Sequence, residues 1–136
     1  MSYLLDTNVI SEIRKANANT GVRAWLAGVQ NRQLFLSVLV VGEIRQGIER
    51  LRSRDAYRAA QLEAWLGTLG TEYADRILRV SIEVAEAWGR LNAVRTLPVI
   101  DGLLAATAYV HGLTLVTRNT ADFDGLEVEA LNPFEM

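Results

Sequence analysis

The chain has 136 residues, half of them hydrophobic, a formal net charge of −2 and no cysteine. A length of this order predicts one domain, 1–136, that buries roughly two thirds of the surface of its unfolded form. The composition excludes a disordered chain, a disulfide scaffold and a thiolate metal site, and the one histidine, His111, cannot build an imidazole cluster, so any metal must be held by oxygen ligands.

The charge balance and the N-terminal residues narrow the class of protein further. Because its net charge is negative, the chain lacks the broad positive potential of many nucleic-acid binders. Of its lysines and arginines, all except Lys15 are arginine, whose planar guanidinium group suits phosphate. The chain contains no run of about eighteen apolar residues and no signal-peptide pattern at its start. We therefore expect a cytoplasmic protein that has no membrane partner.

Strand and helix patterns alternate along the chain. In the first part of the chain, the patterns predict a strand at 3–6 and helices at 9–15 and 21–29. A strand then begins at 33, a helix follows it from a boundary between 37 and 41 to about 53, and another helix covers 55–69. The remaining elements are a strand at 77–81, helices at 82–95 and 101–112, a strand at 113–117, a polar turn at 118–125 and a last strand at 126–134. Such alternation predicts a three-layer α/β fold, with a central, mainly parallel sheet and helices on both faces.

Four acidic residues occupy comparable positions in this pattern. Asp6 closes the first strand, Glu43 lies at the start of the helix after the second, Asp101 opens an almost wholly apolar helix, and Asp122 lies in the turn after "LTLVT". Because parallel sheets place ligands outside the carboxyl ends of their strands, these four acids could converge at one edge.

Each acid also has a purely structural interpretation, as a helix N-cap or, for Glu43, as a partner of the helix dipole. Thr7 is itself an adequate cap, so the Asp6 carboxylate is not required for capping. An unpaired charge is costly at the start of a helix as apolar as the one that follows Asp101. These two features favour a functional cluster over four separate caps.

Converging carboxylates would have a narrow chemistry. Carboxylates within about 4–6 Å of one another repel and need a cation. Oxygen ligands without histidine or cysteine select Mg²⁺ or Mn²⁺, which can polarise a phosphodiester and activate a water. Phosphodiester hydrolysis is the reaction that such a cluster favours.

Four sequence blocks in order carry a resemblance to a known family. "LLDTNV", "SVLVVGE", "PVIDGLLAATA" and "LVTRNTADF", the last followed by "NPF", resemble the PIN domain and, within it, the FitB-like group of VapC toxins. The resemblance covers essentially the whole chain. It implies an Mg²⁺-dependent endoribonuclease, with Mn²⁺ as an alternative ion, that is the toxin of a type II toxin–antitoxin pair.

The resemblance also assigns roles to particular residues. It implies that the catalytic acids are Asp6, Glu43, Asp101 and Asp122, with Asp6 and Asp101 as the direct metal ligands. Residues that orient these carboxylates or water would be Asn8, Thr117 and Asn119. Whether Asn119 or Asp122 lies nearer the metal stays open.

Partners follow from the same resemblance and from nearby basic residues. An RNA substrate could contact Arg14, Lys15 and Arg118, which are close in sequence to the acids, although ordinary solvated helix ends explain them equally well. The family implies a VapB- or FitA-like antitoxin whose tail covers the acidic site, and a homodimer, for which 55–69 is the candidate surface. We interpret Arg45, Glu49 and Arg52 as a solvated helix face.

Two rival functions stay open. An aspartate-nucleophile phosphatase also begins with a strand ending in Asp, but it needs a second Asp two residues later and a downstream lysine, whereas this chain has Asn8 and no lysine after Lys15. The other rival is a binding module without enzyme activity, whose acids only cap helices.

Overall fold

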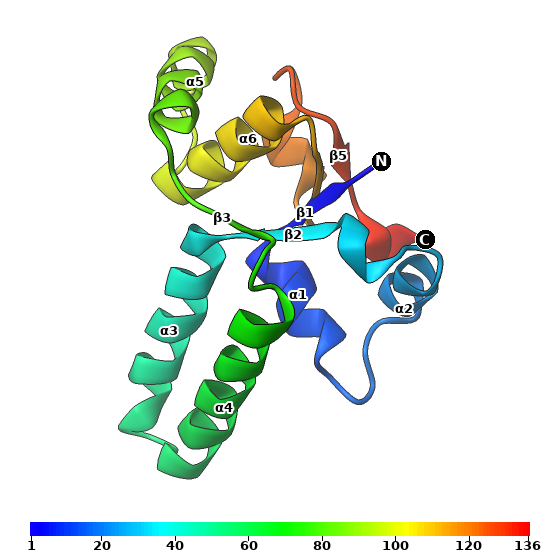
Figure 1. Ribbon diagram of the computed structural model, residues 1–136, viewed down its shortest axis with the longest axis vertical. Helices are drawn as coiled ribbons and strands as arrows, with labels where there is room; N and C mark the ends of the chain where they lie inside the picture. The colour runs from blue at the N-terminus through cyan, green and yellow to red at the C-terminus, as the bar shows by residue number, and fades with distance from the viewer.

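Five short parallel strands form the centre of the molecule (Figure 1). The computed structural model describes all residues, 1–136. The strands are β1 (Tyr3–Leu5), β2 (Leu34–Ser37), β3 (Ile77–Leu78), β4 (Thr114–Val116) and β5 (Ala130–Leu131), in the order β3-β2-β1-β4-β5. Because β1 lies in the middle, the residue that follows it is flanked by strand ends on both sides.

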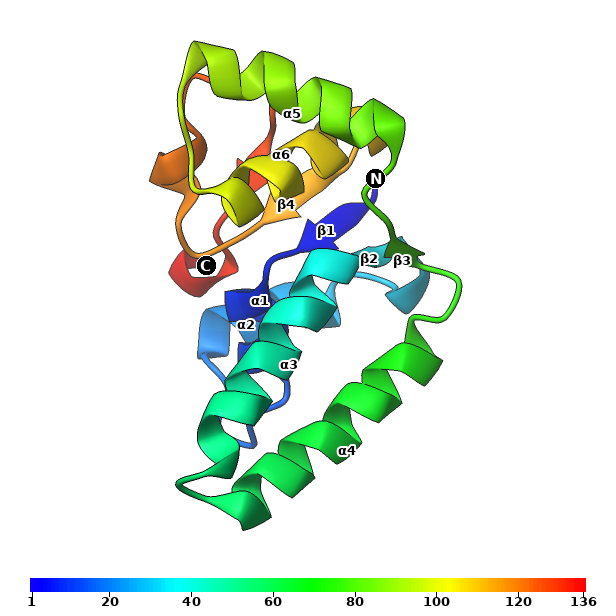
Figure 2. The ribbon, with the colours of Figure 1, turned by 90° about the vertical axis from the view of Figure 1, so that its left-hand side faces the viewer.

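Helices cover both faces of this sheet (Figures 1 and 2). One face carries α5 (Ile82–Val94) and α6 (Val99–His111), and the other carries α1 (Thr7–Ile13), α2 (Thr20–Ala27), α3 (Val38–Arg52) and α4 (Ala56–Glu72). The predicted three-layer α/β class is therefore confirmed, and so is the parallel direction of the sheet.

The strands are apolar on both sides because helices lie above and below them. Leu4, Leu5, Leu36 and Leu115 are fully buried in the main core. In the register of the central pair, Leu5 is opposite Val116, so β1 and β4 end side by side. The residues directly after these two strands consequently lie at the same edge.

Helix α6 lies between the sheet and α5, which explains why it is apolar almost all round. It ends at Gly112, whose φ of 63° is in the left-handed region that glycine adopts without strain, as the sequence predicts. No single helix is long and apolar enough to cross a membrane, and α5 and α6 satisfy those criteria only as a pair bent by 116°.

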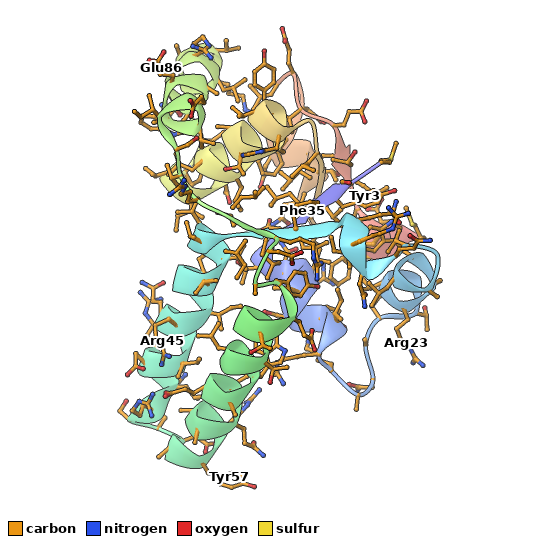
Figure 3. The ribbon with its side chains drawn as sticks, in the orientation of Figure 1. Tyr3, Arg23, Phe35, Arg45, Tyr57 and Glu86 are labelled. Atoms are coloured by element: carbon orange, nitrogen blue, oxygen red, sulfur yellow. The ribbon has the colours of Figure 1, made fainter.

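Helices α3 and α4 form a hairpin that extends away from the sheet (Figure 1). Arg45 and Arg52 of α3 both bind Glu49 of the same helix and Glu63 of α4, with N–O distances of 2.5–3.1 Å. These arginines hold the pKa of Glu49 down at about 2. Figure 3 shows Arg45 on α3 and Tyr57 at the far end of the hairpin. The α3 face that carries Arg45, Glu49 and Arg52, interpreted from the sequence as only solvated, therefore also links α3 to α4.

The C-terminal segment differs from the predicted long strand. Only Ala130–Leu131 pairs with β4, while Leu126 and Val128 pack against the core without forming a strand. Pro133 then begins a short 3₁₀ helix, Pro133–Glu135. The alternating pattern of 126–134 thus reflects alternating burial, and the proline, which has no N–H, ends the pairing.

Candidate active site

Asp6 follows β1 and is held firmly at the carboxyl edge of the sheet. Its backbone N–H donates to the carbonyl of Val116 at 2.9 Å. Its Oδ1 accepts the backbone N–H of Thr7 at 2.7 Å, and its Oδ2 accepts the hydroxyl of Thr117 at 2.8 Å. The residue is 7% exposed. Both carboxylate oxygens are therefore oriented by donors on different elements.

The structure corrects the expectation that Thr7 could cap the first helix and so leave Asp6 free of that role. Asp6, not Thr7, is the N-cap of α1, and the helix begins at Thr7, two residues before the predicted start. As the first helical residue, Thr7 points its N–H at the cap and extends its hydroxyl toward α3. That hydroxyl donates to Oε1 of Glu43 at 2.6 Å.

Glu43 lies in the second turn of α3. The N-cap of that helix is Ser37, whose Oγ accepts the N–H of Leu39, and the first turn contains no acid. The interpretation of Glu43 as a first-turn partner of the helix dipole is therefore wrong. The side chain is half-buried, and the Thr7 hydroxyl is the one group that donates to its carboxylate.

Asp101 is the third residue of α6 and does not cap it, because the N-cap position is Pro98. No protein group donates a hydrogen bond to its carboxylate. Its pKa is raised above the ordinary value, first by partial burial and then by repulsion from Asp6, Asp122 and Glu43. The other three acids are thus close enough for their charges to act on Asp101.

Asp122 is the most exposed of the four acids. It belongs to the 3₁₀ helix Thr120–Phe123, whose N-cap position is Asn119, so the capping interpretation is wrong here as well. Its charge nevertheless helps to raise the pKa of Asp101, so Asp122 lies near that acid.

The four carboxylates have no positive partner in the chain. None of them forms any of the seven salt bridges in the structure. No group of three or more acidic or histidine side chains is arranged to hold a metal ion by itself. Mg²⁺ typically takes one or two carboxylates and keeps several waters. Two carboxylates with waters in the remaining positions would match the coordination that Mg²⁺ prefers.

The three residues expected to orient the acids differ in what they contact. Thr117 is fully buried and binds Asp6 directly, while its Oγ1 accepts the N–H of Asn119 at 3.2 Å. The Asn8 amide lies 3.5 Å from Oδ2 of Asp6, longer than an ordinary hydrogen bond. The Asn119 side chain makes no hydrogen bond to any of the acids.

The three candidate RNA-contacting residues also have partners within the chain. The Arg14 guanidinium lies 5.5 Å from the ring centre of Trp65, and Lys15 pairs with Glu12. Arg118 lies over the ring of Phe134 at 4.3 Å, and its backbone N–H donates to Oδ1 of Asn8. Among the three, Arg118 has the most direct connection to the acidic cluster.

Two contributions to this site escape sequence reasoning. Thr7 is hidden because its residue type suits a cap, so nothing in the sequence signals its contact with Glu43. The C-terminal "NPF" segment supports the loop after β4, since Nδ2 of Asn132 donates to the carbonyl of Arg118 and Phe134 lies under its guanidinium. The occurrence of "NPF" after the fourth block was the available sign of this second contribution.

Known proteins resemble this chain in sequence over nearly its whole length. A family model described as the PIN domain matches residues 3–127. The VapC ribonuclease Y4jK of Sinorhizobium fredii is 32% identical, covering 97% of both chains. Toxin FitB of Neisseria gonorrhoeae is 33% identical, covering 96% of this chain and 97% of its own.

Solved structures show the same fold. The crystal structure of FitAcB from Neisseria gonorrhoeae superposes with a TM-score of 0.89 at 32% identity, over 98% of this chain and 99% of the other. A toxin–antitoxin complex from Klebsiella pneumoniae gives a TM-score of 0.71 at 25% identity, over 99% of this chain and all of the other. The chain therefore belongs to the PIN domain family, among its VapC- and FitB-like members.

Proposed function

We propose that this protein is the toxin of a type II toxin–antitoxin pair and that it cleaves RNA phosphodiester bonds endonucleolytically, with Mg²⁺ or Mn²⁺ as its cofactor. The single observation that carries the proposal is the environment of Asp101, whose carboxylate is repelled by three other acids and has no positive partner. A similar ribonuclease and a similar toxin, each matched over nearly their whole length, support the same conclusion.

Asp6 and Asp101 are the residues that would hold the ion. The Asp6 carboxylate is already oriented by Thr7 and Thr117, so little reorganisation accompanies binding. Asp101 gains most from a cation because its charge is otherwise unbalanced. When bound, such an ion polarises a phosphoryl oxygen and makes the attacking water easier to deprotonate.

Glu43 and Asp122 complete the proposed site. Only one oxygen of Glu43 is engaged by Thr7, so Oε2 is free to orient the attacking water or to accept its proton. Asp122, at the exposed rim, adds negative charge that favours a cation beside Asp101. Arg118 lies next to Thr117 in sequence and is the basic residue that we assign to the RNA phosphates.

The partners belong to the same proposal. We place an antitoxin tail over the acidic edge, and a homodimer surface at 55–69 on α4, where Tyr57 is 76% exposed. A solved structure with a similar chain is described as a toxin–antitoxin complex from Klebsiella pneumoniae. An RNA substrate implies that the protein acts in the cytoplasm. Light scattering of the purified chain tests the dimer, and capture of the protein encoded by the neighbouring reading frame tests the antitoxin.

A binding module that only caps helices is the second candidate, and the structure gives it one argument. Asp6 does cap α1. Asp101 and Asp122 cap nothing, however, and Glu43 is outside the first helical turn. The phosphatase alternative has no additional support, because Asn8 stands where a second Asp would be needed.

The direct test is cleavage of a labelled RNA in Mg²⁺, compared with the same reaction in EDTA. Asp101→Asn should abolish cleavage, whereas Asp124→Asn, a matched change of an exposed acid in the adjacent turn, should leave it unchanged. RNA-end mapping of the products then identifies the cleaved sequence. Full activity in EDTA, or an active Asp101→Asn variant, would contradict the proposal.

A further inference from the structure

Thr7 uses its two hydrogen-bond donors on two different acids. Its backbone N–H donates to Oδ1 of Asp6 at 2.7 Å, and its hydroxyl donates to Oε1 of Glu43 at 2.6 Å. One residue therefore fixes how the acid after β1 lies relative to the acid on α3. The two acids are 37 positions apart in the sequence and belong to different elements.

Glu43 depends on this contact more than Asp6 depends on either of its own. A glutamate side chain has three rotatable bonds, and Glu43 extends from the second turn of a helix with no salt bridge. Asp6, in contrast, is shorter, more deeply buried and bound on both oxygens. Without the Thr7 hydroxyl, no protein group would restrain the Glu43 carboxylate.

The competing structural roles for the Thr7 side chain do not apply. Asp6 supplies the helix cap, so the hydroxyl is not needed for it. Thr7 is only partly buried and does not belong to the hydrophobic core. The contact with Glu43 is the one hydrogen bond that its side chain makes.

We infer that Thr7 is a positioning residue for the proposed cleavage reaction: its hydroxyl holds Oε1 of Glu43 and so directs Oε2 toward the attacking water. This inference rests on the proposed function. A misplacement of a reacting group by about 1 Å can lower a rate by roughly 100-fold, so one hydrogen bond at this position is sufficient to matter. Because this role gives the Thr7 hydroxyl to Glu43 and not to RNA, the Michaelis constant for RNA should not depend on it.

Three variants test the inference. Thr7→Val keeps the shape and removes the donor, and it should lower kcat for RNA cleavage by about 10- to 100-fold with little change in KM. Thr7→Ser restores the hydroxyl and should recover most of kcat. Thr20→Val is the matched control, because Thr20 is the first residue of α2, is exposed and makes no side-chain hydrogen bond, and its helix is capped by Asn19.

A double-mutant cycle with Glu43→Ala shows whether Thr7 acts through Glu43. Thr7→Val should reduce kcat much less in the Glu43→Ala background than in the wild type. The same cycle, measured as shifts of the urea midpoint in EDTA, reports the contact without reference to activity. There too, the two substitutions together should shift the midpoint by less than the sum of their separate shifts.

The outcomes separate the inference from the proposed function. If the wild type cleaves RNA and Thr7→Val retains its kcat, or if Thr7→Ser is as impaired as Thr7→Val, the positioning role is wrong. Additive losses in both cycles would also overturn it. If the wild type fails to cleave RNA in Mg²⁺, the proposed function is lost even where the urea cycle detects the contact, and the positioning role falls with it.

Discussion

Replacing Thr117 with valine removes one hydrogen bond from the centre of the candidate site while keeping the side-chain shape. Thr117 is fully buried, and its hydroxyl donates to Oδ2 of Asp6 at 2.8 Å. Valine fills the same volume but cannot donate. The Asp6 carboxylate, itself 7% exposed, would keep only the N–H of Thr7 and the distant Asn8 amide.

The expected loss follows from the charge on the acceptor. A hydrogen bond to a charged group contributes about 1.5–3 kcal/mol to stability, and an acceptor left buried and unpaired adds to the cost. The N–H of Asn119, which also binds the Thr117 hydroxyl, is at an exposed residue where water can replace that contact. We therefore expect the free energy of unfolding to fall by about 1.5–3 kcal/mol.

The assay is urea unfolding in EDTA, with an unchanged m-value as the sign that only stability has altered. Thr107→Val is the matched control: Thr107 is 1% exposed, but its hydroxyl donates to the carbonyl of Leu103 in the same helix. The helix backbone already satisfies that carbonyl, so the control should lose less than about 1 kcal/mol. A loss at Thr117 no larger than the loss at Thr107 would refute the role assigned to the Asp6 contact.

Three further changes have defined outcomes. Because the pKa of Asp101 is raised, the folded chain holds that proton more tightly than the unfolded chain, so ionised Asp101 destabilises the fold above its folded-state pKa. Asp101→Asn should match or exceed the apo stability of the wild type at neutral pH. In urea titrations, any advantage should shrink as the pH falls below that pKa and vanish below the unfolded-state pKa; a variant that unfolds readily at pH 7 would contradict the repulsion. Gly102→Ala would place a Cβ 3.0 Å from Cδ1 and Nε1 of Trp88. Overpacking of about 1–3 kcal/mol should exceed the helix-propensity gain of about 1 kcal/mol, so thermal unfolding should show a lower Tm. An unchanged Tm would show that the indole moves freely. Glu63→Gln breaks the bridge between α3 and α4 and should lower Tm slightly at low salt, with a smaller difference in about 1 M NaCl; a salt-independent loss would indicate packing instead.

The fold class and the sheet direction follow from the sequence because strand and helix periods alternate and the strands are short apolar runs. The last strand does not follow, because Leu126 and Val128 alternate as strand residues do, although they are buried without pairing to β4. Periodicity reports burial, whereas pairing depends on a neighbouring strand that lies elsewhere in the chain.

The convergence of the acids could be predicted because it follows from topology. Residues directly after parallel strands share an edge, and Asp6 and Thr117 do so through the β1–β4 register. Individual side-chain hydrogen bonds are less predictable. Asp6 caps α1, while the Thr7 hydroxyl donates to Glu43, which is 36 residues away in the sequence. The residues near Thr7 in the sequence therefore do not reveal its partner. Asp6→Asn is a poorer probe than Asp101→Asn, because both carboxylate oxygens of Asp6 accept hydrogen bonds and an amide has only one acceptor oxygen.

The central claim is that the four acids form a cation site, and Mn²⁺ binding tests it most directly. Titration of the metal-free protein, followed by calorimetry or by the electron paramagnetic resonance signal of free Mn²⁺, should reveal a site that Mg²⁺ displaces. Asp101→Asn should weaken or abolish that binding, while Asp124→Asn leaves it intact. Absence of a measurable site in the wild type, or binding that is unchanged in Asp101→Asn, would contradict the account.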